Sequence, residues 1–233
     1  MKRWNWVEKA AFGAFLFWSA AGLIFTLLRT SPENVAHWPV PGWLASFVDL
    51  CLKTGDPILI LLAFTNTHLH AARQWTPAAA RRWALIVCAV AFAVETLGAR
   101  TGFPFGSYRY TERFGPLLGV VPLTIPLAWH VVVTNALFVV RATERYLSRA
   151  LEAAVVAVVC AGYDFILEPF ATRAKHYWDW SAGEPPLQNY LAWFVISALL
   201  VWFFAPTHAT RFPKDRRPLF LLGLTLLIFI AGR

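Results

Sequence analysis

Charged side chains are scarce in this sequence. Only 15% of its 233 residues are Asp, Glu, Lys or Arg, whereas roughly a quarter of an average soluble domain is charged. Apolar residues take their place, at 58% of the chain. They form continuous runs of roughly 20 residues, the length that a helix needs to cross a bilayer. Only helices and closed barrels satisfy the backbone in lipid, and continuous runs rather than alternation exclude a barrel.

We therefore expect an all-α fold, a polytopic transmembrane helical bundle that forms a single integral membrane domain over residues 1–233. Seven spans are predicted, at about 9–28, 43–65, 83–98, 117–140, 151–170, 189–205 and 218–232. The second contains Lys53, Asp56 and Pro57 in its middle. Because proline removes a backbone donor, we expect a broken or re-entrant element there.

The basic residues suggest an orientation. The first apolar run is long for a signal-peptide core, so we interpret it as a retained first helix. With seven spans, most Lys and Arg fall in the N-terminus and in alternate loops, which predicts a cytoplasmic N-terminus in a multi-pass protein of the cytoplasmic membrane. Cations beside anionic lipid headgroups account for the pI near 9.8, so no nucleic-acid partner is expected.

Cofactor and metal motifs are missing. The three cysteines lie inside predicted spans without CxxC spacing, which suggests neither a disulfide framework nor a zinc site. There is no GxGxxG after a strand, no P-loop and no GxSxG. His68 and His70 are two apart and point to different helix faces, so no metal site is indicated. We expect neither a cofactor nor a metal.

Ionisable residues inside spans are costly and are therefore functional candidates. Asp164 and Glu168 lie four apart in CAGYDFILEPF, on one helix face. Two desolvated carboxylates that repel each other favour holding a proton near neutral pH, ready for delivery. The alternative is a structural role, as an interhelical hydrogen bond or an ion pair with Arg173 or Lys175.

Four further candidate residues have structural alternatives. Glu95 ends the third span and could belong to a site or pair with Arg100. His130 follows Trp129 in the fourth span and could equally be a hydrogen-bonded packing residue. Lys53 and Asp56 are three apart and are expected to neutralise each other.

The segment TGFPFGSYRYTERFGPLLGVVPLTIPLAWH (101–130) concentrates special residues. Glycines recur every four residues from just before the segment, at Gly98, Gly102 and Gly106. Pro104 interrupts this run, so turns are favoured over GxxxG helix pairing. Pro122 and Pro126 fall where the fourth span should begin. We interpret the segment as a pocket wall, formed by a loop that folds back onto a distorted helix.

Aromatic residues gather in or beside the loops that follow the third and fifth spans: Tyr108, Tyr110, Trp178, Trp180, Tyr190 and Trp193. In a seven-span topology both loops face the same side of the membrane, and the predicted acids approach that side. Acids and aromatic rings in an apolar cavity suit one chemistry, the protonation of an alkene and stabilisation of the resulting carbocation.

Two long motifs carry a resemblance to a known family. GARTGFPFGSYRYTERFGPLLGVVPLTIPLAW and YDFILEPFATRAKHYWDWSAGEPPLQNYLAW resemble the signatures of the carotenoid-biosynthesis membrane hydratases, of the γ-carotene 1′-hydratase and bisanhydrobacterioruberin hydratase type. The resemblance covers roughly residues 43–205. It implies a hydro-lyase that adds water to the terminal C1=C2 double bond of an acyclic carotenoid ψ-end. The partners would be lycopene, γ-carotene or a fifty-carbon carotenoid, water, membrane lipids and other enzymes of the pathway.

The reaction implied by this resemblance needs an acid that protonates C2. We expect Asp164 or Glu168 to be that acid, with Glu95 or the other member of the pair orienting the attacking water. The remaining candidates would line the end-group pocket or hold water or a carboxylate: Tyr108, Tyr110, Trp129, His130, Asn189 and Trp193.

Two alternatives remain open at this stage. An isoprenoid or lipid-modifying transferase would use Asp164 and Glu168 to hold Mg²⁺ and diphosphate, but it would need a second acid-rich motif. A non-catalytic carotenoid-binding membrane protein would depend on shape and not on protons.

Overall fold

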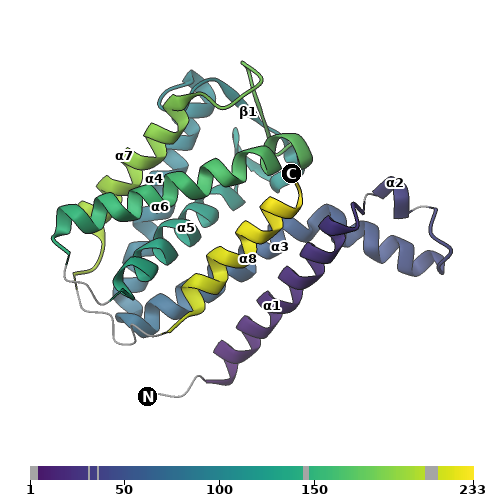
Figure 1. Cartoon of the computed structure of the whole chain (residues 1–233), viewed down its shortest axis with the longest axis horizontal. Coiled ribbons are helices and arrows are strands. Elements are labelled where there is room, and N and C mark those ends of the chain that lie inside the picture. Colours follow the sequence, from purple (N-terminus) through teal and green to yellow (C-terminus); the bar gives the residue numbers. More distant parts are fainter. Residues whose placement is uncertain (1–4, 31, 36, 144–146, 208–214) are drawn as a thin grey trace.

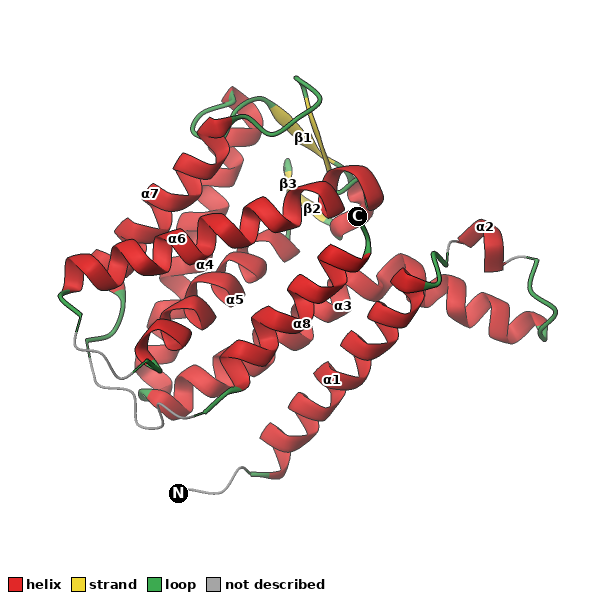
Figure 2. Cartoon of the chain, viewed as in Figure 1, coloured by secondary structure: helices red, strands yellow, loops and turns green. Residues whose placement is uncertain are grey.

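The computed structural model describes residues 5–30, 32–35, 37–143, 147–207 and 215–233 (Figures 1 and 2). Its helices are α1 (Trp6–Leu27), α2 (Pro32–Val35), α3 (Gly42–Gln74), α4 (Pro77–Thr101), α5 (Thr124–Arg141), α6 (Arg149–Pro169), the π-helical turn η2 (Phe170–Ala174), α7 (Leu187–Phe204) and α8 (Arg217–Ala231). Short strands and one 3₁₀ turn lie between them: β1 (Tyr108–Tyr110), η1 (Glu112–Phe114), β2 (Leu117–Leu118), β3 (Val121–Pro122) and β4 (Trp178–Trp180).

The predicted all-α membrane bundle is confirmed. Helices α1, α4, α5, α6 and α7 are long and apolar enough to cross a membrane. Local signals define their ends: Asn5 forms a capping box with Glu8 at the start of α1, and Thr76 caps α4 just before Pro77. Gly102 ends α4 in the left-handed conformation, with φ of 78°.

The second predicted span is not broken. Helix α3 runs without interruption through Pro57 for 33 residues, about 50 Å at 1.5 Å per residue. Pro57 removes one backbone donor, but in membrane bundles neighbouring helices support such positions. Helix α1 packs along α3 here, and the Trp18 indole donates to the Gly55 carbonyl at 2.9 Å.

The fourth predicted span begins later than expected. Residues 117–122 form the two-stranded hairpin β2–β3, and α5 starts at Thr124. Pro122 lies in β3, while Pro126 lies in the first turn of α5, where a missing N–H breaks no helical bond. The expected distortion of this helix by its prolines is therefore wrong.

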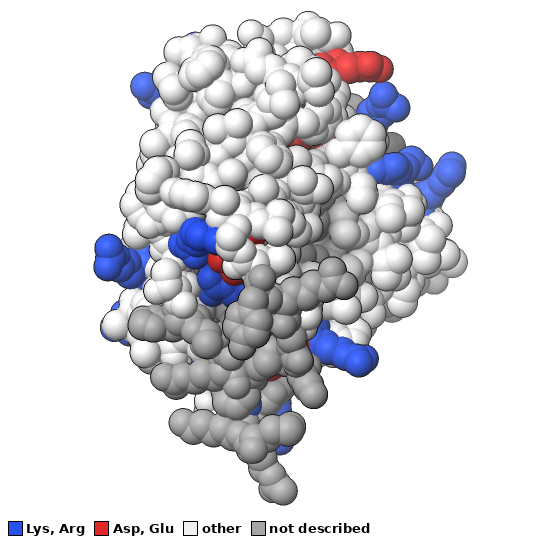
Figure 3. All heavy atoms as spheres, turned by 60° about the vertical axis from the view of Figure 1, so that its left-hand side comes forward, with Lys and Arg blue, Asp and Glu red and all other residues white. Residues whose placement is uncertain are grey.

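Helix α5 is the centre of the bundle. It packs against α3, α4, α6 and α8, and most of its side chains are buried. Helix α1 lies outside this group against α3 and α8, with α8 alongside α5 (Figure 1). On the face in Figure 3, wide uncharged areas separate the few Lys and Arg side chains, as expected for a surface in lipid.

The ion pairs differ from the prediction. Lys53 pairs with Asp49 at 2.7 Å, and Asp56 pairs with Lys175 at 2.9 Å, so Lys53 and Asp56 do not neutralise each other. Arg173 pairs with Glu184. The cations proposed as partners of the Asp164–Glu168 pair are therefore bound elsewhere.

Some of the basic residues that predict the orientation lie in 1–4 and 208–214, outside the described residues.

Candidate functional site

A small chamber lies where the C-terminal end of α4 meets the ends of α5, α6 and α7. Its open volume is about 80 Å³. Its walls are mostly aromatic and aliphatic, with a few convergent polar side chains, the usual composition of a small-molecule site. The lining includes eight of the nine residues singled out from the sequence: Glu95, Tyr108, Tyr110, Trp129, Asp164, Glu168, Asn189 and Trp193.

A two-stranded ladder borders the chamber. Strand β1, from the α4–α5 connection, pairs antiparallel with β4, from the α6–α7 connection. Tyr108 faces Trp180 and Tyr110 faces Trp178, and all four side chains are buried. Because successive strand residues point to opposite faces, the YRY and WDW triplets place their rings inward. Their central residues point outward as an exposed ion pair.

Glu95 is surrounded by hydrogen-bond donors. Its Oε2 accepts from the Tyr108 hydroxyl at 2.6 Å and from the Tyr110 hydroxyl at 2.7 Å, and its Oε1 accepts from the Trp129 indole at 2.7 Å. Burial, followed by the charge of Glu95, raises the pKa of both tyrosines well above the usual value, so both keep their protons and donate. Glu95 is therefore bound by three donors while it is only 5% exposed.

Asp164 and Glu168 form a pair of buried carboxyl groups that one side-chain amide bridges. The Asn189 side chain donates to Asp164 Oδ2 at 2.6 Å and to Glu168 Oε1 at 3.3 Å. Glu168 Oε2 also accepts from the indoles of Trp180 at 2.9 Å and Trp178 at 3.3 Å. Among the described residues, Asp164 receives this one side-chain hydrogen bond, whereas Glu168 receives three.

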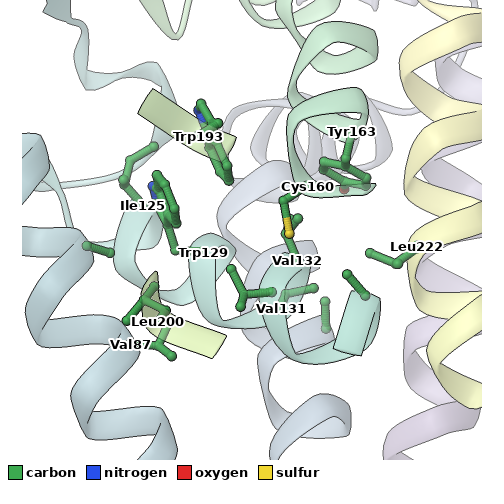
Figure 4. Close-up of a cluster of buried hydrophobic side chains, with 14 of the residues drawn as sticks. Val87, Ile125, Trp129, Val131, Val132, Cys160, Tyr163, Trp193, Leu200 and Leu222 are labelled. Atoms are coloured by element: carbon green, nitrogen blue, oxygen red, sulfur yellow. The ribbon is translucent and has the colours of Figure 1, made fainter. Parts of the chain in front are cut away.

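Trp129 and Trp193 form one wall of the chamber. Their rings stack with centroids 3.7 Å apart and planes 3° apart, joining α5 to α7 (Figure 4). The indole of Trp129 also donates a hydrogen bond to Glu95, and this bond fixes the position of the stacked rings. Flat aromatic faces beside carboxylates can stabilise a cation that forms between them.

His130 is not part of the chamber. It is fully buried beside Phe64 and His68, and its Nδ1 lies 3.3 Å from the Thr134 hydroxyl. Its Nε2 has no hydrogen-bond partner among the described residues. Helical geometry explains the difference from Trp129, because adjacent residues point about 100° apart around the axis. The structure thus does not bring His130 to the carboxylates.

Several residues that line the chamber are not among the site residues predicted from the sequence. Trp178 and Trp180 were recognised as clustered aromatics, but their role as donors to Glu168 was missed. The shared alternation of YRY and WDW could have indicated that the two segments pair. Asp56 also borders the chamber. It accepts a hydrogen bond from Lys175, and a contact between residues 119 positions apart cannot be predicted from a local sequence pattern.

The fold and the site together define a polytopic helical membrane protein with an enclosed chamber of carboxylates and aromatic rings. The chain belongs to the carotenoid biosynthesis protein family, whose model matches residues 55–232. It is 30% identical over 162 residues to the bisanhydrobacterioruberin hydratase of Haloarcula japonica, covering 64% of this chain. The alignment spans about half of that relative, 54% of its length. No solved structure matches the chain.

Proposed function

We propose that this protein is a carotenoid hydratase, which adds water across the terminal C1=C2 double bond of an acyclic ψ-end. The main support is that Asp164, Glu168 and Asn189 line the same aromatic chamber as the Glu95 cluster. Family membership and the printed activity of the Haloarcula relative support the same assignment. The reaction needs no electron donor or acceptor, because adding water is redox-neutral.

The first step of the proposed mechanism is proton transfer to C2, which leaves a tertiary cation at C1. We assign the proton to Asp164, because it accepts fewer hydrogen bonds than Glu168 and because two ionised carboxylates so close together would repel each other. Two neighbouring carboxyls in an apolar site share a proton more readily than they both ionise. Asn189 holds both groups in place and is a positioning residue.

Capture of the cation by water completes the reaction. The water oxygen bonds to C1, and its surplus proton passes to a carboxylate, which we assign to Glu95. Its three donors, Tyr108, Tyr110 and Trp129, keep it ionised until the oxonium ion formed at C1, a far stronger acid, gives up its proton. A proton then returns from Glu95 to Asp164, which restores the acid for the next turnover. The stacked rings of Trp129 and Trp193 stabilise the cation until water arrives. The product is a tertiary alcohol at C1.

Co-expression in a bacterium that makes lycopene tests this function. The pigments are separated by chromatography and weighed by mass spectrometry, beside an Asp164→Asn control. We expect a pigment heavier by one molecule of water, absent from the control. Strains that supply γ-carotene or a fifty-carbon precursor extend the test to other ψ-ends. Unchanged pigments in all three strains, with the protein present in the membrane, would contradict the proposal.

The same strains discriminate the two alternatives. A transferase would yield prenylated or otherwise enlarged products and would depend on Mg²⁺. A non-catalytic carotenoid-binding protein would function equally well with Asp164→Asn and Glu168→Gln, because both substitutions conserve shape. Full hydration by both single variants would exclude the proposed proton transfer.

A further inference from the structure

The chamber is too small for a whole carotenoid. Its open volume of about 80 Å³ lies well below the roughly 300–1,000 Å³ of sites that hold drug-sized ligands. It can hold an end group or a few waters, so the rest of a long polyene must lie elsewhere.

A second, larger cavity of about 530 Å³ lies between α1, α3 and α8. One face of α3 lines it, with Val48, Cys51, Leu52, Gly55, Asp56 and Leu59 at helical spacing. The facing wall comes from α1, at Trp18, Ala21, Gly22 and Phe25. The cavity is therefore a groove that runs along two helices and is mainly apolar.

The groove adjoins the chamber. Four side chains line both spaces: Asp56, Leu59, Phe170 and Ile228. At its outer edge the groove is bordered by Phe17 and Phe47, which are 71% and 57% exposed and would therefore face lipid. A molecule dissolved in the bilayer could thus enter sideways and reach the carboxylates without passing through water.

We propose that this groove binds the polyene chain of the substrate, while the reacting end group occupies the chamber. This inference rests on the proposed function. The occupant is a linear isoprenoid, because the groove is mainly apolar, runs along two helices and adjoins the chamber. Phe170 and Ile228 lie between the two spaces and line both of them. Beside them, Lys175 Nζ lies 2.9 Å from Asp56 Oδ2.

Filling the groove tests the inference. Gly55 lines it, and a Cβ added there meets no atom within 4 Å, so Gly55→Phe places a ring in the cavity without a backbone clash. Cys51→Phe, one turn earlier on the same face, is a second variant in case the first does not fold. Gly162→Phe is the matched control, because Gly162 is exposed on α6, also has no atom within 4 Å, and lines neither cavity.

The readout is pigment retention and needs no turnover. Each change is made in an Asp164→Asn background, the protein is purified in mild detergent from lycopene-producing cells, and lycopene per protein is measured by visible absorbance. An added ring that overlaps the polyene should weaken its binding free energy by about 1.4 kcal/mol or more, which corresponds to a loss of about tenfold or more in bound lycopene. We expect that loss for Gly55→Phe and Cys51→Phe and no change for Gly162→Phe.

The outcomes separate this inference from the proposed function. Equal retention in the groove variants and the control would overturn it, and so would a background protein that retains no lycopene. Loss of a co-purifying phospholipid instead of lycopene would assign the groove to a bilayer lipid and also overturn it. If retention falls as expected but the parent protein makes no hydrated product, the groove assignment stands and the hydratase assignment fails.

Discussion

The three carboxyl groups of the site have two kinds of surroundings. Glu95 and Glu168 each accept three hydrogen bonds from phenols, indoles or an amide, whereas Asp164 accepts one, from Asn189. Ionised carboxylates only accept, and donors arranged around them favour that state. The carboxyl with the fewest donors is therefore the best candidate to carry a proton.

The first prediction concerns Asp164. Asp164→Asn conserves shape but cannot deliver a proton, and general acid catalysis contributes about 10²–10⁴-fold. We expect product formation in membranes to fall by about 10²-fold or more, measured as hydrated pigment per protein. The control is Asp179→Asn, an acid on β4 whose side chain is 50% exposed and points away from the chamber. Equal losses in both variants would contradict the assignment.

The second prediction concerns the tyrosines that hold Glu95. Tyr110→Phe removes a donor to a buried carboxylate, which costs about 1–3 kcal/mol of stability. We expect a lower melting temperature and slower hydration. Thermal unfolding and hydration activity are both measured on detergent-solubilised protein. Tyr190→Phe is the control, because Tyr190 is half-buried on α7 and lies outside the chamber lining. A Tyr110→Phe protein with unchanged activity and melting temperature would refute the role of this hydrogen bond.

Sequence reasoning found most of these residues because their chemistry is costly in lipid. Acids within apolar runs, such as Glu95 and Asp164, must have partners, so they can be identified without a structure. Their particular partners could not be predicted. The donors to Glu168 come from β4 and α7, and which loop folds over which helix end depends on tertiary contacts.

Among the elements, the β1–β4 ladder has the largest effect on the site. It joins two interhelical connections and points two phenols and two indoles at the acids. Its approach to α4 is close at Gly98, where an added Cβ would lie 2.6 Å from the Phe105 ring and 2.9 Å from the Tyr108 hydroxyl. A larger residue there would therefore push the Phe105 ring and the Tyr108 hydroxyl away from α4.

The third prediction tests this close approach. Gly98→Ala should shift Phe105 and Tyr108, weaken the Tyr108–Glu95 hydrogen bond and reduce both hydration and thermal stability. Gly162→Ala is the matched control in a helix, with no neighbouring atom within 4 Å. It should keep full activity and gain about 0.5–1 kcal/mol from the better helix propensity of alanine. For both variants, stability is measured by thermal unfolding in detergent and activity by product yield. Full activity in Gly98→Ala would show that the ladder tolerates displacement.

Element boundaries were the less predictable part of the fold. The lengths and apolar runs of α1, α6 and α7 follow closely from the sequence. The hairpin β2–β3 was missed, because residues 117–122 are as apolar as the helix that follows them. The break expected at Pro57 was wrong, since α1 and α3 support one another across that position.

In the whole molecule, α5 lies at the centre of the bundle, and the chamber lies near one end of it, beside the ends of α4, α6 and α7. Helix α8 has 15 residues, about 22 Å, and is shorter than the roughly 30 Å hydrocarbon core. It lies against α5 and α6, so neighbouring helices and a locally thinner bilayer can accommodate it.

The fourth prediction concerns orientation. Seven crossings with a cytoplasmic N-terminus place the C-terminus, the β1–β4 ladder and the chamber on the outer side. Reporter fusions test this: we expect a periplasmic reporter to be active at the C-terminus and inactive at the N-terminus, and a cytoplasmic reporter to show the reverse. Reversed activities would place the chamber on the cytoplasmic side and would refute the orientation drawn from the basic loops.

The measurement that tests the central claim most directly is isotopic. Membranes containing the protein are incubated with lycopene in oxygen-18-labelled water, and the product is analysed by mass spectrometry. The proposed mechanism predicts one labelled oxygen in each hydrated end group, dependent on Asp164. A hydroxylated product that lacks the label would contradict the account, because its oxygen would not have come from water. So would a labelled product formed equally well by Asp164→Asn.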